Sequence, residues 1–150
     1  MVQPNAAALI LGPTGLAYDS VADTLYVAST ADNQIFAVSQ AGTRMSSAGR
    51  GTLIFEDEHL RGPLALAFAP NGALITSNGD AVNADPTQPS EIVEFTKSGK
   101  FIGQFKVDAT QGGAFGLAIA LVGGDTARLA TVEDNTNSII VIDQGVVPGG

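Results

Sequence analysis

Short apolar runs, separated by polar and glycine-rich turns, follow one another along the chain. Residues 91–96 alternate between apolar and polar side chains, and residues 24–29 are rich in types that favour strands. Alternation with a period of two residues is typical of half-buried strands. No segment repeats its apolar residues at the 3.6-residue spacing of a helix over ten positions. The pattern therefore predicts an all-β protein.

One stretch rich in glycine, leucine and alanine occurs three times and organises the rest of the chain. Its Leu-Ala pairs begin at Leu16, Leu66 and Leu117, about 50 residues apart. A fixed period of this size is typical of repeat architectures. We therefore expect a single domain over residues 1–150, built from repeat units at about residues 6–57, 58–108 and 109–147.

Each unit is expected to hold short antiparallel strands joined by turns. The expected strands cover residues 6–11, 15–18, 24–29, 34–39, 52–55, 64–68, 73–77, 91–96, 101–107, 115–120, 127–132 and 138–142. In the third unit the fourth strand is missing or reduced to Val146-Val147. Four strands per unit are typical of β-propeller blades, with the small side chains of the first strand nearest the crowded axis.

The units resemble the NHL-repeat family of β-propellers. The residues that carry the resemblance are Gly12-Pro13 with Gly15–Ala17, 25–28 and 32–35 in the first unit, Gly62-Pro63, Leu66-Ala67 and 70–72 in the second, and 116–118 and 137–139 in the third. The resemblance implies a ring of six blades, of which three units would form half.

Three blades are too few to close a ring, because propellers typically have 4–8 blades. Two copies could associate as a three-plus-three homodimer, or the chain could belong to a larger propeller. In the homodimer, the apolar run Ala6–Leu11 of one copy would complete the last blade of the other. This exchange would cover open sheet edges.

Charge and composition exclude several classes of function. Fifteen acidic residues oppose seven basic ones, for a net charge of -8, so nucleic acid would be repelled. No apolar run approaches the ~20 residues that span a bilayer. Cysteine is absent, which excludes disulfides and thiolate chemistry. The localisation stays open, with an extracellular or periplasmic site favoured.

The charges sort between the two ends of the expected blades. Loops after second and fourth strands share one face, which receives Asp32, Glu56, Asp57, Glu58, Asp80, Asp85, Asp108, Glu133 and Asp134, with Arg61. The opposite face receives Arg44, Arg50, Lys97 and Lys100 together with Asp19, Asp23, Asp125 and Asp143. We expect an acidic ring around one mouth of the channel. The alternative is that the exposed loops of an acidic protein are simply acidic.

Candidate binding residues lie in the loops of this acidic face. They are Asp32, Asn33, His59, Asn78, Asp80, Glu133, Asp134 and Asn135. Carboxylate and amide oxygens are ligands that Ca²⁺ prefers, so calcium is possible, although no cofactor is expected. The resemblance extends to calcium-dependent lactonases, but no ligand motif matches here residue by residue. Hydrogen bonding within turns is the other interpretation of these side chains.

His59 is the only histidine, and it follows three acidic residues. It could act as a general base flanked by carboxylates, or simply be exposed to solvent. A single histidine excludes a histidine-rich metal centre within one chain. No nucleophile-elbow signature of a Ser-His-Asp hydrolase is present. Asn33 and Asn137 precede third strands, and we interpret them as residues that lock loops by hydrogen bonding.

Three functional hypotheses follow from the sequence. The preferred one is a non-catalytic module that binds a protein, peptide or glycan through its loop face, and no catalytic residue is assigned. The second is a lactonase- or lyase-like propeller enzyme with a metal in the channel. The third is a structural unit whose repeats exist mainly to pair with each other.

Overall fold

A computed structural model describes residues 12–79, 91–109, 112–124 and 126–145. Within these ranges the chain forms strands and no helix, which confirms the all-β prediction. The strands are β1 (Pro13–Asp19), β2 (Thr24–Ser29), β3 (Gln34–Ser39), β4 (Thr52–Glu56), β5 (Pro63–Phe68), β6 (Leu74–Asn78), β7 (Glu91–Phe95), β8 (Phe101–Lys106), β9 (Ala114–Gly123), β10 (Thr126–Glu133) and β11 (Ser138–Gly145). The strands expected at 6–11 and 146–147 lie outside the described residues.

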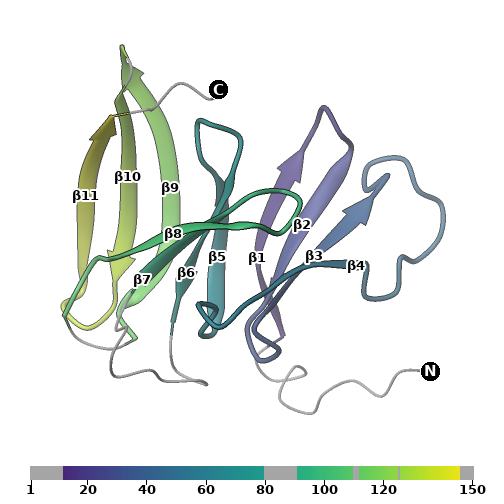
Figure 1. Cartoon of the computed structure of the whole chain (residues 1–150), viewed down its shortest axis with the longest axis horizontal. Helices are drawn as coiled ribbons and strands as arrows, with labels where there is room; N and C mark the ends of the chain where they lie inside the picture. Colours follow the sequence, from purple (N-terminus) through teal and green to yellow (C-terminus); the bar gives the residue numbers. More distant parts are fainter. Residues whose placement is uncertain (1–11, 80–90, 110–111, 125, 146–150) are drawn as a thin grey trace.

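The strands form consecutive antiparallel sheets, each paired in chain order. Blade 1 contains β1 to β4, blade 2 contains β5 to β8, and the described part of blade 3 contains β9 to β11. The sheets stand side by side in Figure 1, with β5 in contact with both β1 and β9. This is the arrangement of a partial β-propeller, as the sequence predicts. β9 is longer than predicted, because its pairing with β10 continues to Gly123.

The repeated Leu-Ala pair places one side chain on each face of its blade. Successive side chains of a strand point to opposite faces. In blade 2, Leu66 packs into the core shared with blade 1, whereas Ala67 packs into the core shared with blade 3. In blade 1, Ala17 is buried against blade 2. Each blade thus has a front face toward the preceding blade and a back face toward the next one.

Two pairs of aromatic rings fill the interface between blades 1 and 2. Tyr26 meets Phe68 edge to face at 5.8 Å, and Phe55 stacks on Phe95 with ring centroids 4.4 Å apart. Each pair takes one ring from each blade. Aromatic pairs of this geometry contribute about 0.5–1.5 kcal/mol beyond the area that they bury. The buried core between blades 2 and 3 is formed by aliphatic residues instead.

Polar contacts at the turns also connect blades 1 and 2. Lys97 Nζ lies 2.6 Å from Asp19 Oδ2 and 5.3 Å from the centre of the Phe68 ring. The hydrogen bond from Lys97 holds the pKa of the Asp19 carboxyl below its usual value. Toward the other end of the blades, the Thr30 hydroxyl donates to the carbonyl of Pro63 at 2.8 Å.

Gly15 allows the backbones of β1 and β5 to approach closely. A Cβ atom at this position would lie 2.5 Å from the Leu64 carbonyl oxygen and 2.7 Å from the Ala65 carbonyl carbon. Those neighbours are backbone atoms, so no side-chain rotation could relieve the contact. The glycine is therefore required by the distance between two blades.

We predict that Gly15→Ala lowers the free energy of unfolding by about 1–3 kcal/mol, because the blades must separate to admit the methyl group. Urea unfolding followed by circular dichroism measures the change. Gly103→Ala is the matched control, since a Cβ atom there meets no atom within 4 Å. Equal destabilisation by the two substitutions would contradict this account of the interface.

Candidate functional site

The loops predicted to form the acidic face are joined by hydrogen bonds. They comprise the β2–β3 turn, the β4–β5 corner, the described ends of β6 and β7, and the β10–β11 turn. Asn33 bonds to Gly62, and Asn78 bonds to the backbone of His59, so the turn and the corner lie at one end of the blades. Asp80 and Asp85 lie outside the described residues. We call this end the loop face.

Asn33 connects the β2–β3 turn to the start of blade 2. Its backbone is in the left-handed region, with φ at 54°. Its Oδ1 accepts the N–H of Gly62 at 2.7 Å, and the Gly62 carbonyl accepts the N–H of Gly79 at 2.9 Å. Asn is one of the few residues that adopts this conformation readily. The prediction that Asn33 locks a loop is confirmed.

Asp32 is held by partners from its own blade. Its Oδ2 accepts from the Ser29 hydroxyl at 2.9 Å and from the Arg50 guanidinium at 2.8 Å. The assignment of Arg50 to the opposite face was wrong. The guanidinium lies 5.3 Å from the centre of the Phe36 ring and bonds to Asp32, so the long side chain covers Phe36 and ends at the loop face. Arg50 thereby offsets part of the negative charge predicted there.

Asn78 and Glu91 form a buried polar pair at the ends of β6 and β7. Both residues are almost completely buried. Asn78 Nδ2 donates to Glu91 Oε1 at 2.9 Å and to the carbonyl of His59 at 2.6 Å. The second bond ties blade 2 to the corner that precedes it. Burying a carboxylate is costly unless it is hydrogen-bonded, so this pairing explains how Glu91 is tolerated.

Glu133 occupies the corresponding position in blade 3. It is almost fully buried, and its Oε1 accepts the N–H of Asn135 at 3.0 Å. The carboxylate fills the space where a side chain at position 113 would begin, so any other residue there would displace it. Asp134 donates its N–H to the Gly113 carbonyl at 2.8 Å, while its side chain is exposed. These bonds close the end of blade 3.

Sequence reasoning missed that one repeat position supplies a buried polar group in each of the three blades. Ser29, Asn78 and Glu133 each end the second strand of a blade and pair with Pro13, Pro63 and Ala114 respectively. Aligning the repeats at their Leu-Ala pairs would have revealed this position. Glu91 was also missed, because an alternating strand pattern predicts an exposed side chain at its polar positions.

His59 is packed against neighbouring side chains. Its ring stacks on Phe101, with centroids 3.9 Å apart and planes inclined by 13°. Its Nδ1 is in hydrogen-bonding contact with Asp57 Oδ1, and 29% of its side chain is exposed. Burial raises the pKa of Asp57, but its bonds to His59 outweigh burial and hold that pKa below its usual value. The interpretation of His59 as merely exposed to solvent was therefore wrong.

The described part of the loop face was also tested as a cation site. Within the described ranges, no group of three or more His, Cys, Asp or Glu residues could hold a metal ion. Two buried oxygen atoms there, Asn78 Oδ1 and Glu133 Oε2, have no hydrogen-bond partner among the described residues. Only part of the loop that was expected to supply calcium ligands is described.

No helix long and apolar enough to cross a membrane occurs in the described ranges.

Comparison with solved structures places the chain among propeller enzymes in fold. Virginiamycin B lyase from Staphylococcus aureus aligns with 92% of this chain at a TM-score of 0.59 and 14% identity. A streptogramin B lyase aligns with 100% of the chain at 0.62 and 16% identity. A protein assigned as a gluconolactonase aligns with 90% at 0.52 and 20% identity. At these identities the likeness concerns the fold.

The chain spans less than half the length of each of these structures. It covers 42% of the virginiamycin B lyase chain, 44% of the streptogramin B lyase chain and 40% of the gluconolactonase chain. No known family model matches the sequence, and no curated protein matches it. The partial β-propeller fold is therefore shared with a part of each of these structures.

We predict that Asn33→Ala lowers the free energy of unfolding by about 1–3 kcal/mol, since the Gly62 N–H loses its acceptor. Asn33→Gly keeps the left-handed backbone accessible, so it isolates the contribution of the hydrogen bond. Gln40→Gly is the control, because Gln40 has the same backbone conformation, with φ at 54°, at an exposed position in the turn after β3. Urea unfolding measures all three variants. Wild-type stability in Asn33→Gly would contradict the role given to the hydrogen bond.

Proposed function

We propose that the chain is a non-catalytic, NHL-like propeller module that binds a protein, peptide or glycan through its loop face. In this proposal it works as half of a six-bladed ring, completed by a second copy. One observation carries the proposal. The isoleucine at the second position of the third strand is 0% exposed in blade 1, 0% in blade 2 and 68% in blade 3.

These isoleucines are equivalent by strand register. Ile35 pairs with Ala28 and packs toward blade 2, and Ile92 pairs with Ser77 and packs toward blade 3. Ile139 pairs with Val132 on the back face of blade 3, and no described blade follows it. The same chemistry that forms two interfaces is thus present a third time without a cover.

The front face of blade 1 offers the complementary surface. Leu16 is 60% exposed, whereas Leu66 at the equivalent position is 8% exposed because it packs on blade 1. Tyr18 and Leu53 are also exposed large apolar residues of blade 1. Burying a side chain of this size contributes about 1.5–3 kcal/mol, so joining the two open faces would stabilise the assembly strongly.

A two-fold axis would join the open faces of two copies at both ends. Blade 3 of each copy would meet blade 1 of the other, which closes the ring without leaving an unused face. The position of Asn137 supports this arrangement. It corresponds to Asn33, and Gly12 corresponds to Gly62, so the same asparagine-to-glycine bond could form between copies.

The loop face would then carry the binding surface of the ring. Glu56, Glu58 and Asp134 are exposed on it, so a partner with basic or hydrogen-bond-donating groups is favoured. His59, Asn78 and Glu133 are occupied in holding blade ends together. This structural use of the polar groups supports a binding role over catalysis.

We predict that Ile139→Asp shifts the protein from a dimer to a monomer of 15.2 kDa, measured by light scattering. A carboxylate in an apolar junction would be desolvated without a partner. Val21→Asp is the matched control, because Val21 is 96% exposed in a turn outside the blade faces. A monomeric wild-type protein would contradict the homodimer and favour the alternative that the chain is a part of a larger propeller.

A metal-dependent lactonase- or lyase-like enzyme is the second candidate. The names of the fold neighbours support it, as do the two buried oxygen atoms of Asn78 and Glu133. Such a site would use carboxylate and amide oxygens to bind Ca²⁺.

Calorimetric titration with Ca²⁺ separates the two candidates. For a non-catalytic module we predict no saturable heat in the wild-type protein. Saturable heat that disappears in Glu133→Gln, but persists in Glu94→Gln at the other end of blade 2, would support the enzyme candidate instead.

A further inference from the structure

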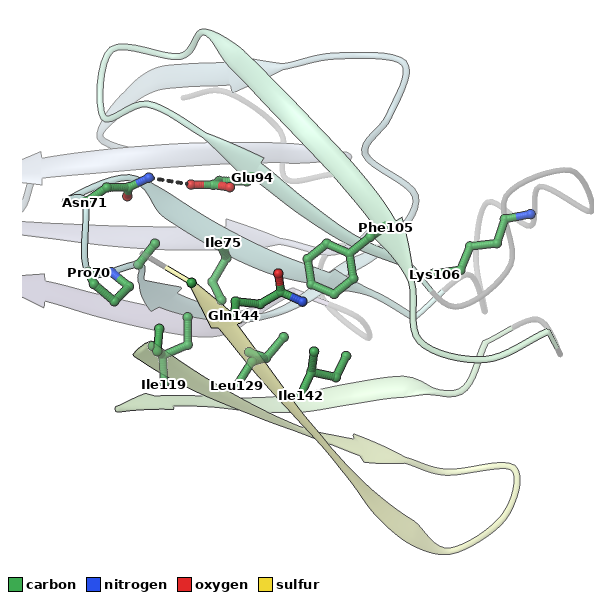
Figure 2. A pocket seen from close by; sticks show the side chains of 13 residues that line it. Pro70, Asn71, Ile75, Glu94, Phe105, Lys106, Ile119, Leu129, Ile142 and Gln144 are labelled. Atoms are coloured by element: carbon green, nitrogen blue, oxygen red, sulfur yellow. Dashed lines mark hydrogen bonds between the residues drawn. The ribbon is translucent and has the colours of Figure 1, made fainter. Parts of the chain in front are cut away.

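A cavity of about 520 Å³ lies between blades 2 and 3 and extends from the β5–β6 turn to Lys106 of β8. Figure 2 shows Ile75 and Phe105 of blade 2 on one side, and Ile119, Leu129 and Ile142 of blade 3 on the other. The Asn71–Glu94 hydrogen bond lies at one end, and Gln144 lines the cavity from β11. The cavity is therefore mainly apolar, with few polar groups at its border.

The strand registers show which residues occupy the same space between blades 1 and 2. Across blade 2, Phe68, Leu74 and Phe95 are paired in one row. Across blade 3, the equivalent row is Ile119, Leu129 and Ile142. Both rows face the preceding blade, so Ile119 replaces Phe68 and Ile142 replaces Phe95.

The wall that blade 2 contributes to the cavity differs in the same way from the wall that blade 1 contributes to the first interface. Tyr26 on β2 pairs with Ala17, and Ile75 on β6 pairs with Ala67, so Ile75 replaces Tyr26. Phe55 pairs with Ile35, and Phe105 pairs with Ile92, so the phenylalanine of the fourth strand is kept. Three of the four rings at the first interface are thus isoleucines at the second.

Phe105 has consequently lost its stacking partner. Phe55 stacks on Phe95 and is 3% exposed, whereas Phe105 faces Ile142 and is 37% exposed. The missing ring volume is the physical origin of the cavity, because the blades keep similar backbones while the side chains between them become smaller. One face of the Phe105 ring remains available for an aromatic neighbour.

The mouth of the cavity is open because an ion pair is also replaced. At the first interface, Lys97 and Asp19 form a salt bridge above Phe68. In the equivalent positions, the second interface has Gln144 and Ala69, which line the cavity. No ammonium–carboxylate pair of this kind closes the second interface within the described residues.

We propose that this cavity binds a small planar aromatic molecule. Its ring stacks on Phe105, in the place that Phe95 occupies on Phe55, and the three isoleucines enclose its other face and edges. A hydrogen-bonding group on the ring is within reach of Gln144 or Glu94 at the border. Cavities of 300–1,000 Å³ with apolar walls and a few polar groups are typical of small-molecule sites.

Indole is a suitable probe, since it offers a flat ring system and one N–H donor. We expect saturable chemical-shift changes at the methyl groups of Ile75, Ile119 and Ile142 in methyl-labelled full-length protein, and none at buried Ile35. Ile142→Phe restores the ring of the first interface and is expected to weaken indole binding at least about tenfold, as is Ile119→Phe. Ile102→Phe, at an exposed position of β8 that does not line the cavity, is the matched control and should bind indole as the wild type does.

Three results would overturn the proposal. They are no saturable shifts in the wild-type protein, undiminished binding by folded Ile142→Phe and Ile119→Phe variants, or equally tight binding of cyclohexylmethanol, which has similar bulk but no aromatic ring. The methyl spectrum of each variant reports whether it is folded. The outcome is independent of the loop-face side chains that hold the blade ends together, because His59, Asn78 and Glu133 do not line the cavity.

Discussion

A blade of this kind has two apolar faces, and the structure is organised around the two interfaces at which neighbouring blades cover these faces. A four-stranded sheet cannot bury either face by itself, so each blade is stable only against its neighbours. The Leu-Ala pair meets this need by directing one side chain to each side, as Leu66 and Ala67 do in blade 2. Gly15 and Asn33 serve the same contact, since one allows the backbones to approach and the other ties the blade ends.

The repeat keeps its backbone while changing what lies between the blades. The first interface is filled by aromatic rings and closed by Asp19 and Lys97, whereas the second has isoleucines and an open border. The end of the second strand varies similarly, through Ser29, Asn78 and Glu133, while remaining buried. Because the strand pairing is repeated while the side chains change, one architecture holds both a filled interface and a cavity.

Much of the fold could be predicted from the sequence because strands carry local signals. The bounds of β2 and β3 agree with the prediction, since alternation and turn residues are read directly from neighbouring positions. The contacts of long side chains were not predictable in this way. Arg50 bonds to Asp32 and His59 stacks on Phe101, and both contacts join residues that are far apart in the sequence.

The candidate sites illustrate the same limit. Asn33 was identified because asparagine before a strand has a local conformational reason to be there. Glu91 and the cavity beside Phe105 were not identified, because the residues around them are known only once the strand registers align distant repeats. For this chain, the position of a residue within its repeat is thus more informative than the local sequence pattern. The exposure of Ile139, for example, is notable only because the equivalent residues Ile35 and Ile92 are buried.

The dependence of the unfolding temperature on protein concentration tests most directly whether uncovered blade faces govern this molecule. If the open faces of blades 1 and 3 are covered by association, mass action stabilises the folded state, and the midpoint rises as the concentration is increased. A range of about a hundredfold in protein concentration is suitable for this measurement. A midpoint that stays constant over this range would show that the three blades are stable with two faces uncovered. That result would contradict the account.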